Sequence, residues 1–220
     1  MAYSFTSAGS QYLSATTTIF KNQSKITLAA WVYRNAAGTA QPVGCGKVSN
    51  DRFMFYPWSD NNLYYTIGTG GNLAFGFQSG AGATASAWNH IVQVFDGTQT
   101  GNSNRLKGFL NGLQQTLSYP GAAVPANTVN DPDIEDFTIN RFQVSSVFGN
   151  GRYAEIGVWQ EALTAAEIAS LAKGMTCDKI RPQNLVFYAP LIRDLIDQKG
   201  GLVITNNNGA TVANHPRVYA

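Results

Sequence analysis

One turn of the sequence brings aromatic and amide side chains close together. Tyr56 and Trp58 precede Asn61 and Asn62 by a few positions. An aromatic ring stacks well on apolar C–H groups, and an amide both donates and accepts hydrogen bonds, so this set suits the ring faces and hydroxyl groups of a sugar. Trp58 follows a proline in a predicted loop, and loops carry many binding residues. We therefore expect Trp58 to be exposed, with core packing or a protein interface as the alternative role of the group.

Acidic side chains are concentrated in a second loop. Asp131, Asp133 and Asp136 stand close together after a proline-rich segment. Hard oxygen donors at close spacing are what calcium requires, although the loop lacks the EF-hand pattern and a solvated turn explains the same residues. No motif requires a cofactor, and calcium is the candidate ion.

Histidine and cysteine are too rare to build the common catalytic or zinc sites. The chain has His90, His215, Cys45 and Cys177, whereas a catalytic triad or a zinc centre draws several such residues together. We expect His90, close to Trp88 in a predicted strand, to be a hydrogen-bonded structural histidine. The cysteines lack Cys-x-x-Cys spacing, so we expect two free thiols, or a disulfide if their separation allows one.

The composition is that of a weakly charged, turn-rich chain long enough for one core. The sequence has 220 residues, of which 13% are charged, and its net charge is +2. The scattered Lys and Arg cannot form the basic stripe that nucleic acid binding needs. The first ten residues lack the basic and apolar regions of a signal peptide, and the apolar run 26–33 is too short to span a bilayer. We expect a protein made in a cytoplasm that contacts neither nucleic acid nor membrane.

Short strands separated by turns dominate the chain. Apolar runs predict an opening hairpin or strand pair from 3–5 and 12–13, and further strands at 26–33, 52–56, 63–67, 73–78, 88–97, 106–110, 113–117, 137–142 and 153–159. Asn111-Gly112 predicts a type I′ turn because both residues tolerate positive φ. Many short strands at regular spacing are typical of a β-sandwich.

The stretch 151–174 predicts a strand followed by a short helix. Apolar residues on both alternation sets indicate a strand covered on both faces. Thr164 and Glu167 then form a capping box, and the final glycine stands where a left-handed C-terminal cap belongs. We assign Glu155 to a strand end and Glu161 to the turn before the helix.

Two more predicted strands, 185–191 and 201–205, follow the helix, with a turn at 206–209. The predicted fold class is therefore all-β, a two-sheet antiparallel β-sandwich with one short helix near residues 164–172.

Four segments together carry a family resemblance: Ile26-Thr-Leu-Ala-Ala-Trp-Val-Tyr33, Trp88-Asn-His-Ile-Val-Gln-Val-Phe-Asp-Gly97, Phe109-Leu-Asn-Gly112, and the strand and helix from Ala154 to Ile168. In this order they resemble the laminin-G-like, concanavalin A-like jelly rolls, which implies two antiparallel sheets packed face to face. In many relatives an element like 185–191 opens the domain. We therefore predict a single domain over 1–220, with its main sandwich at 1–178 and C-terminal strands at 179–220 that complete the sheet in a permuted order.

The chain also resembles laminin-G-like proteins encoded among tailed-phage structural genes. That resemblance implies a non-catalytic virion accessory protein, such as a capsid decoration or a head or tail appendage. We expect it to form a homo-oligomer, to contact a major capsid protein or other virion proteins, and to be located in the virion. The alternative function is a glycan-binding, lectin-type module that uses Tyr56, Trp58, Asn61 and Asn62 on cell-surface glycans.

A third hypothesis is a retaining glucanase. Asp131-Pro-Asp-Ile-Glu135 resembles the catalytic strand of concanavalin A-like glucanases, in which one carboxylate attacks the sugar and another donates a proton. Asp131 is shorter than the family's Glu, and Pro132 would remove a hydrogen-bond donor from a strand that must be central. We therefore expect no enzyme activity.

Overall fold

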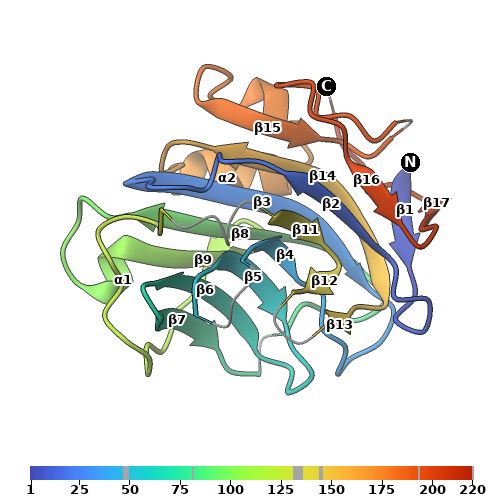
Figure 1. The fold of residues 1–220 in the computed structure, drawn as a ribbon. Helices are drawn as coiled ribbons and strands as arrows, with labels where there is room; N and C mark the ends of the chain where they lie inside the picture. The colour runs from blue at the N-terminus through green and yellow to red at the C-terminus, as the bar shows by residue number, and fades with distance from the viewer. Residues whose placement is uncertain (47–49, 81, 131–135, 144–145, 193, 220) are drawn as a thin grey trace.

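The structure, a computed structural model, describes residues 1–46, 50–80, 82–130, 136–143, 146–192 and 194–219. Two antiparallel sheets lie face to face and form a sandwich (Figure 1), which confirms the predicted all-β fold. Among these residues the helical elements are α1 (Asn102–Arg105), α2 (Ala165–Ala172) and a 3-10 turn at Cys177–Lys179. Within these residue ranges, no helix combines the length and apolar character that crossing a membrane would take.

The strands of each sheet are given in hydrogen-bonded order. Sheet A consists of β10 (Leu113–Gln114), β9 (Leu106–Leu110), β8 (Trp88–Asp96), β3 (Lys25–Arg34), β14 (Gly151–Trp159), β1 (Ala2–Phe5) and β17 (Thr211–Ala213), and β15 (Leu185–Ala189) also pairs with β14. Sheet B consists of β16 (Thr205–Asn207), β2 (Tyr12–Thr16), β11 (Asp136–Ile139), β4 (Val43–Cys45), β5 (Phe53–Pro57), β6 (Leu63–Thr69) and β7 (Asn72–Gln78). A separate hairpin is formed by β12 (Arg141–Phe142) and β13 (Val147–Phe148).

The hydrophobic core lies between the sheets because alternate residues of each strand point inward. Leu28 and Val32 of β3 and Phe53 and Phe55 of β5 are fully buried in this core. A second apolar cluster covers the outer face of sheet A, where α2 lies. The central strands of sheet A are therefore apolar on both faces, as the sequence predicts.

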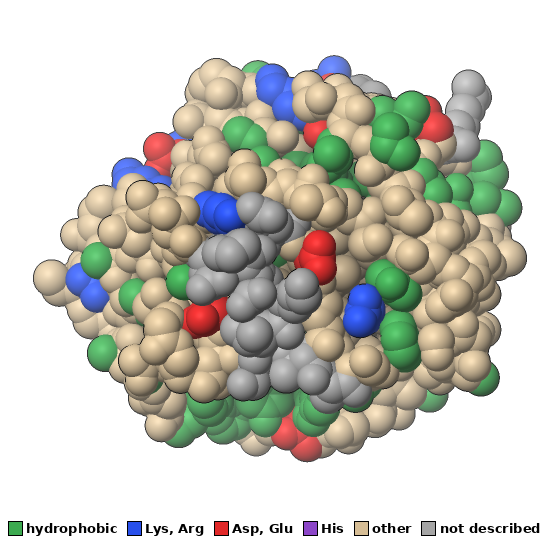
Figure 2. All heavy atoms as spheres, viewed as in Figure 1, with side chains coloured by type: hydrophobic (Ala, Val, Ile, Leu, Met, Phe, Trp, Pro, Cys, Tyr) green, Lys and Arg blue, Asp and Glu red, His purple; other side chains and the backbone are tan. Residues whose placement is uncertain are grey.

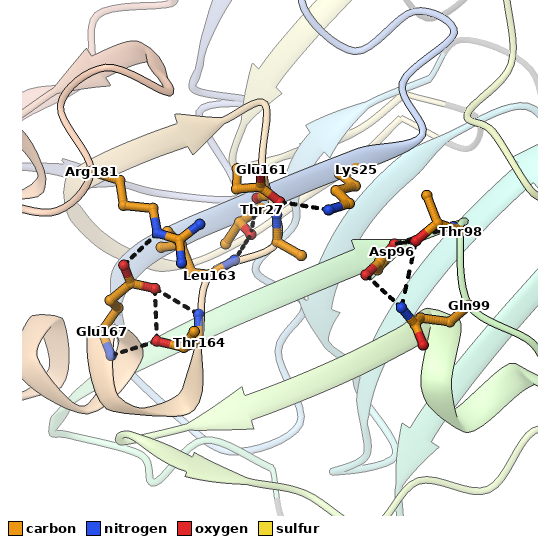
Figure 3. Close-up of polar contacts among 11 residues, drawn as sticks. Lys25, Thr27, Asp96, Thr98, Gln99, Glu161, Leu163, Thr164, Glu167 and Arg181 are labelled. Carbon is orange, nitrogen blue, oxygen red and sulfur yellow. Dashed lines mark hydrogen bonds and ion pairs between the residues drawn. The ribbon is translucent and has the colours of Figure 1, made fainter.

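The predicted start and end of the helix are confirmed. The Thr164 hydroxyl accepts a hydrogen bond from the backbone N–H of Glu167, and the Glu167 carboxylate accepts one from the N–H of Thr164 (Figure 3). Gly174 follows the helix with a φ of +102°. The same carboxylate pairs with Arg181, so the cap also fixes the chain that leaves the 3-10 turn.

Two strand predictions near the N-terminus and in the middle of the chain are wrong. Segments 3–5 and 12–13 form no hairpin, because β1 inserts between β14 and β17 of sheet A while β2 lies in sheet B. The strand predicted over 137–142 breaks at Asn140, whose φ is +72°. The Asn140 side chain is buried and bonds the carbonyls of Gln11 (2.9 Å) and Gly149 (3.0 Å), which holds the chain in this turn.

The Asn111-Gly112 hairpin is confirmed, with φ values of +51° and +83°. Its second strand, β10, is shorter than predicted. After Gln114 the chain crosses to the other sheet, where Ser118 forms a bridge with Phe77 of β7.

Glu155 lies at a bulge within β14, not at a strand end as predicted. Its φ is +52°, and the register with β3 shifts between Ala154 and Gly157. The carboxylate is buried, accepts a hydrogen bond from the Tyr188 hydroxyl (2.6 Å) and lies 3.1 Å from Nε2 of His215. The bulge lets β14 pair with β1 in its first half and with β15 in its second half.

The C-terminal segment adds strands to both sheets. In sheet A, β15 pairs with β14 and β17 pairs with β1. In sheet B, β16 pairs with β2. The strand predicted at 201–205 is displaced, since in that range Val203 makes only an isolated bridge with Ile196 and β16 begins at Thr205. The permuted order of these strands relative to other jelly rolls remains our proposal.

The two sheets approach closely where Tyr65 of β6 faces Gly108 of β9. The Tyr65 hydroxyl donates to the carbonyl of Phe109 (3.1 Å), and a Cβ atom on Gly108 would lie 2.1 Å from a ring carbon of Tyr65. Because this ring is fully buried, it has no space into which it can move.

We predict that Gly108→Ala lowers the free energy of unfolding by about 2 kcal/mol through overpacking, measured by urea denaturation. Gly9→Ala is the matched control. The atoms nearest to a Cβ at Gly9, at 2.9 to 3.3 Å, belong to the ends of the Thr6 and Gln11 side chains, so this change should be nearly neutral. Equal stabilities of the two variants would contradict the prediction.

Candidate functional site

A cavity of about 320 Å³ opens at the rim of the sandwich beside the turn that carries Trp58. We call it the rim cavity. Its lining combines apolar side chains with hydroxyl and amide groups, namely Trp58, Val147, Phe148, Ser7, Thr39, Ser59 and Asn150. Pockets for small molecules typically have this make-up, and the volume is at the lower end of their range.

Trp58 is held by a tight turn and by two aromatic neighbours. The backbone N–H of Asn61 donates to the Trp58 carbonyl (3.1 Å), and the N–H of Trp58 donates to the carbonyl of Asn62 (2.9 Å). The Trp58 ring centroid lies 5.4 Å from that of Tyr56 and 5.5 Å from that of Phe142. The half-buried indole is therefore fixed before any ligand arrives, which lowers the entropic cost of binding.

Tyr56 supports Trp58 and is not part of the cavity lining. Only 8% of Tyr56 is exposed, and its ring stacks on Tyr64 at 5.3 Å. Burial raises the pKa of Tyr56 to about 12, so the phenol is neutral at physiological pH.

Asn61 and Asn62 use their amides within the protein. The side-chain oxygen of Asn61 accepts from Arg34 at 3.5 Å. In Asn62 the side-chain oxygen accepts from the backbone N–H of Gly80 (3.1 Å), and the side-chain nitrogen donates to Asp60 (3.0 Å). The structure thus places both amides in the loops beside the cavity, where Asn61 bonds the Arg34 side chain and Asn62 bonds the backbone of Gly80.

Arg34, which the sequence does not single out, organises the wall of the rim cavity. It ends β3 with its side chain buried, and only 1% of the residue is exposed. Nη2 donates to the carbonyls of Thr39 (3.0 Å) and Trp58 (3.4 Å), while Nη1 donates to the carbonyl of Ala83 (3.1 Å). One guanidinium therefore ties together three loops, and burial lowers its pKa.

The β12–β13 hairpin supplies the rest of the apolar lining. Val147 and Phe148 reach the cavity, and the Phe148 ring lies 5.8 Å from Tyr12. Arg141, the register partner of Phe148, stacks over Tyr12 with 4.8 Å between the guanidinium carbon and the ring centroid. No local pattern predicts this hairpin, because the turn at Asn140 that creates it depends on partners far away in the chain.

Aromatic side chains continue from the cavity across the outer face of sheet B. Tyr64 stacks on Phe77 at 5.4 Å, and Phe75 lies 6.1 Å from Tyr64. All three are partly exposed. On the face seen in Figure 2, the coloured Lys, Arg, Asp and Glu side chains are scattered, and no patch of one charge forms among them.

The predicted calcium and glucanase residues fall mostly outside the described part of the chain. Asp131, Asp133 and Glu135 are not described, whereas Asp136 is the first residue of β11. Among the described residues, no three His, Cys, Asp or Glu side chains are grouped as a metal site would require. Calcium binding and the absence of catalysis stay predictions.

The histidine and cysteine predictions have separate outcomes. Cys45 and Cys177 are free and buried, one in the core between the sheets and one in the cluster beneath α2. Only 2% of His90 is exposed, and its ring lies 5.2 Å from Trp31. Its Nδ1 is buried without a hydrogen-bond partner among the described atoms, so His90 is a packed residue whose Nδ1 lacks the predicted hydrogen bond.

A larger cavity of about 620 Å³ lies beside the C-terminal end of α2, lined by Ser170, Lys173, Met175, Lys179 and Tyr219. None of the predicted binding residues lies there. Its aromatic ring, Tyr219, is 66% exposed, and the Lys179 ammonium already pairs with Asp178 at 3.1 Å. The rim cavity is the better-built site, because packing holds the Trp58 ring and hydrogen bonds hold the side chains of Thr39 and Asn150.

Comparison with known proteins first defines the class of fold. A putative carbohydrate binding protein from Bacteroides ovatus is similar over all of this chain, at a TM-score of 0.68 and 15% identity, and this chain covers 61% of it. The CBM40 domain of a Ruminococcus gnavus sialidase, bound to α2,3-sialyllactose, is similar over 78% of this chain and 95% of its own, at a TM-score of 0.57 and 10% identity. A native heptameric pentraxin from Limulus polyphemus is similar over 93% of this chain and 89% of its own, at a TM-score of 0.51 and 15% identity.

These likenesses show a concanavalin A-like jelly roll. The family model described as the concanavalin A-like lectin/glucanases superfamily matches residues 7–169, and the chain belongs to this superfamily. The family resemblance seen in the sequence is thereby confirmed. No curated protein sequence matches the chain.

His90 makes the stability of the protein depend on pH. Burial lowers the pKa of His90 to about 3, whereas an exposed imidazole has a pKa of about 6.5. As the pH falls below 6.5, the unfolded chain binds a proton that the folded protein does not bind until about pH 3. We predict that the free energy of unfolding falls by about 1.6 kcal/mol between pH 6.5 and 5, measured by urea denaturation.

In the His90→Gln variant this fall should largely disappear, whatever the variant's stability at pH 7. His215→Gln is the matched control, because it removes the other histidine and leaves His90 in place. Parallel pH profiles of the wild type and His90→Gln would contradict the assignment.

Proposed function

We propose that the protein is a carbohydrate-binding module of the lectin type and that its ligand occupies the rim cavity. The observation that carries the proposal is the rigid, half-buried ring of Trp58 in one cavity with the side chains of Thr39, Ser59 and Asn150. The indole face suits the C–H surface of a sugar ring. The hydroxyl and amide groups suit its hydroxyl groups.

The similar folds support this function over the others considered. The Bacteroides protein is described as a putative carbohydrate binding protein, and the Ruminococcus domain holds a sialylated sugar. These are properties of those proteins, and at 10–15% identity they reach this chain only through the fold. The observation specific to this chain is the cavity beside Trp58.

The virion role stays a prediction drawn from the sequence. None of the three similar structures named above is a virion protein, and nothing in the fold identifies a capsid partner. The heptameric pentraxin bears on the predicted homo-oligomer only as an example of a similar fold that assembles. A sugar-binding module carried on a virion would be consistent with both functions.

We predict that Trp58→Ala lowers glycan affinity at least tenfold, since removal of a stacked ring and its buried contacts costs about 1.4 kcal/mol or more. The measurement is a glycan array, followed by titration of any glycan that binds. Trp88→Ala is the matched control, because Trp88 is also half-buried but lies on β8 of sheet A against Tyr33. A wild-type protein that binds no glycan, or equal binding by both variants, would refute the proposal.

A further inference from the structure

The guanidinium of Arg34 is a buried charge with neutral hydrogen-bond partners. Among the described residues its acceptors are three backbone carbonyls and the side-chain amide of Asn61. Its Nε is buried without a hydrogen-bond partner among the described atoms. Arginine stays protonated in proteins, so this positive charge persists without a paired carboxylate among the residues that the structure describes.

The charge lies directly behind the wall of the rim cavity. Two of its acceptors, the carbonyls of Thr39 (3.0 Å) and Trp58 (3.4 Å), belong to residues that line the cavity. The guanidinium is therefore bonded directly to the backbone of two residues that line the cavity. Charges in such a partly dry environment act on each other more strongly than charges at the surface, and salt screens them less.

The other described charges near the cavity do not cancel this effect. Arg141 adds a second cation next to Tyr12 and Phe148. The carboxylate of Asp60, beside Ser59, is exposed and bonds the Tyr64 hydroxyl (2.7 Å) and the amide of Asn62 (3.0 Å). Water screens an exposed carboxylate far more than it screens the buried guanidinium.

We infer that the rim cavity selects sugars that carry a carboxylate over the same sugars without the charge, and that Arg34 is the residue that sets this preference. The inference rests on the proposed carbohydrate-binding function and names its class of ligand. Arg34 acts through the wall and does not touch the ligand. It is a positioning residue for the three loops and the source of the charge selectivity.

The direct test compares each acidic sugar with its own neutral ester. The methyl glycosides of glucuronic acid, galacturonic acid and N-acetylneuraminic acid, and the methyl ester of each, are titrated into the wild-type protein by calorimetry. We expect the acid to bind at least tenfold more tightly than its ester, a difference of about 1.4 kcal/mol. Equal affinities, or binding of neutral glycans alone, would overturn the inference and leave carbohydrate binding intact. A protein that binds no glycan of any kind would refute the proposed function itself.

Two variants assign the selectivity to Arg34. Arg34→Lys keeps the charge and should keep the ratio of acid to ester affinity, even where both affinities fall. Arg34→Gln removes the charge and should bring the ratio close to one in protein shown to be folded by circular dichroism. A folded Arg34→Gln variant that keeps the full ratio would overturn the assignment. If Arg34→Gln does not fold, Arg141→Gln, which removes the second cation, replaces it as the test. This variant should lower the ratio of acid to ester affinity and still prefer the acid. A ratio of one in Arg141→Gln would overturn the assignment to Arg34.

Discussion

The site depends on a buried arginine bonded to neutral acceptors. Removing a cation from water costs several kcal/mol, and Arg34 recovers this cost through hydrogen bonds to carbonyls in three separate loops. Hydrogen bonds to a charged group contribute about 1.5–3 kcal/mol each. The loops around Thr39, Trp58 and Ala83 thus share one donor. A displacement of any of them would leave part of a buried charge without a partner, and this couples the shape of the cavity to the stability of the fold.

A layer of aromatic side chains supports the other side of the site. Tyr56 is buried beneath Trp58 and packs against Tyr64 and Phe142. Rings in such contact lose little further freedom when a ligand binds, because they were ordered when the protein folded. The same aromatic surface extends to Phe77 on β7. These partly exposed rings form an aromatic surface on the outer face of sheet B.

Two local irregularities in the backbone make the strand pairing around β14 and the β12–β13 hairpin possible. The bulge at Glu155 lets one strand serve two partners, so that β1 and β15 share an edge of β14. The left-handed turn at Asn140 ends β11 and sends the chain into the hairpin that carries Phe148. In both cases a non-glycine residue adopts a conformation that costs free energy. In both cases the buried side chain makes polar contacts that offset this cost. Glu155 bonds Tyr188, and Asn140 bonds the carbonyl of Gly149.

Signals that act over a few residues could be read from the sequence. The capping box at Thr164, the turn at Asn111-Gly112 and the short apolar runs of β5, β6 and β7 each depend on neighbours along the chain, and the structure has them as predicted. The turn at Trp58 was also readable from the proline before it and the polar residues after it. The expected exposure of Trp58 was wrong, because its ring is half-buried and packs against Tyr56 and Phe142. The burial of Tyr56 could not be read from the sequence, because the sequence does not show that other aromatic rings will cover it.

Only the tertiary structure decided the contacts between distant segments. The sequence predicted Asn61 and Asn62 as ligand contacts, which stays a prediction, but it did not show that their side chains would bond Arg34, Asp60 and Gly80. Arg34 itself looks in the sequence like the polar end of a strand. Its burial follows from loops 5, 24 and 49 residues away in the chain that close over it. Such a residue cannot be recognised from local pattern, because its partners are backbone carbonyls, which every residue possesses and which only the fold brings together.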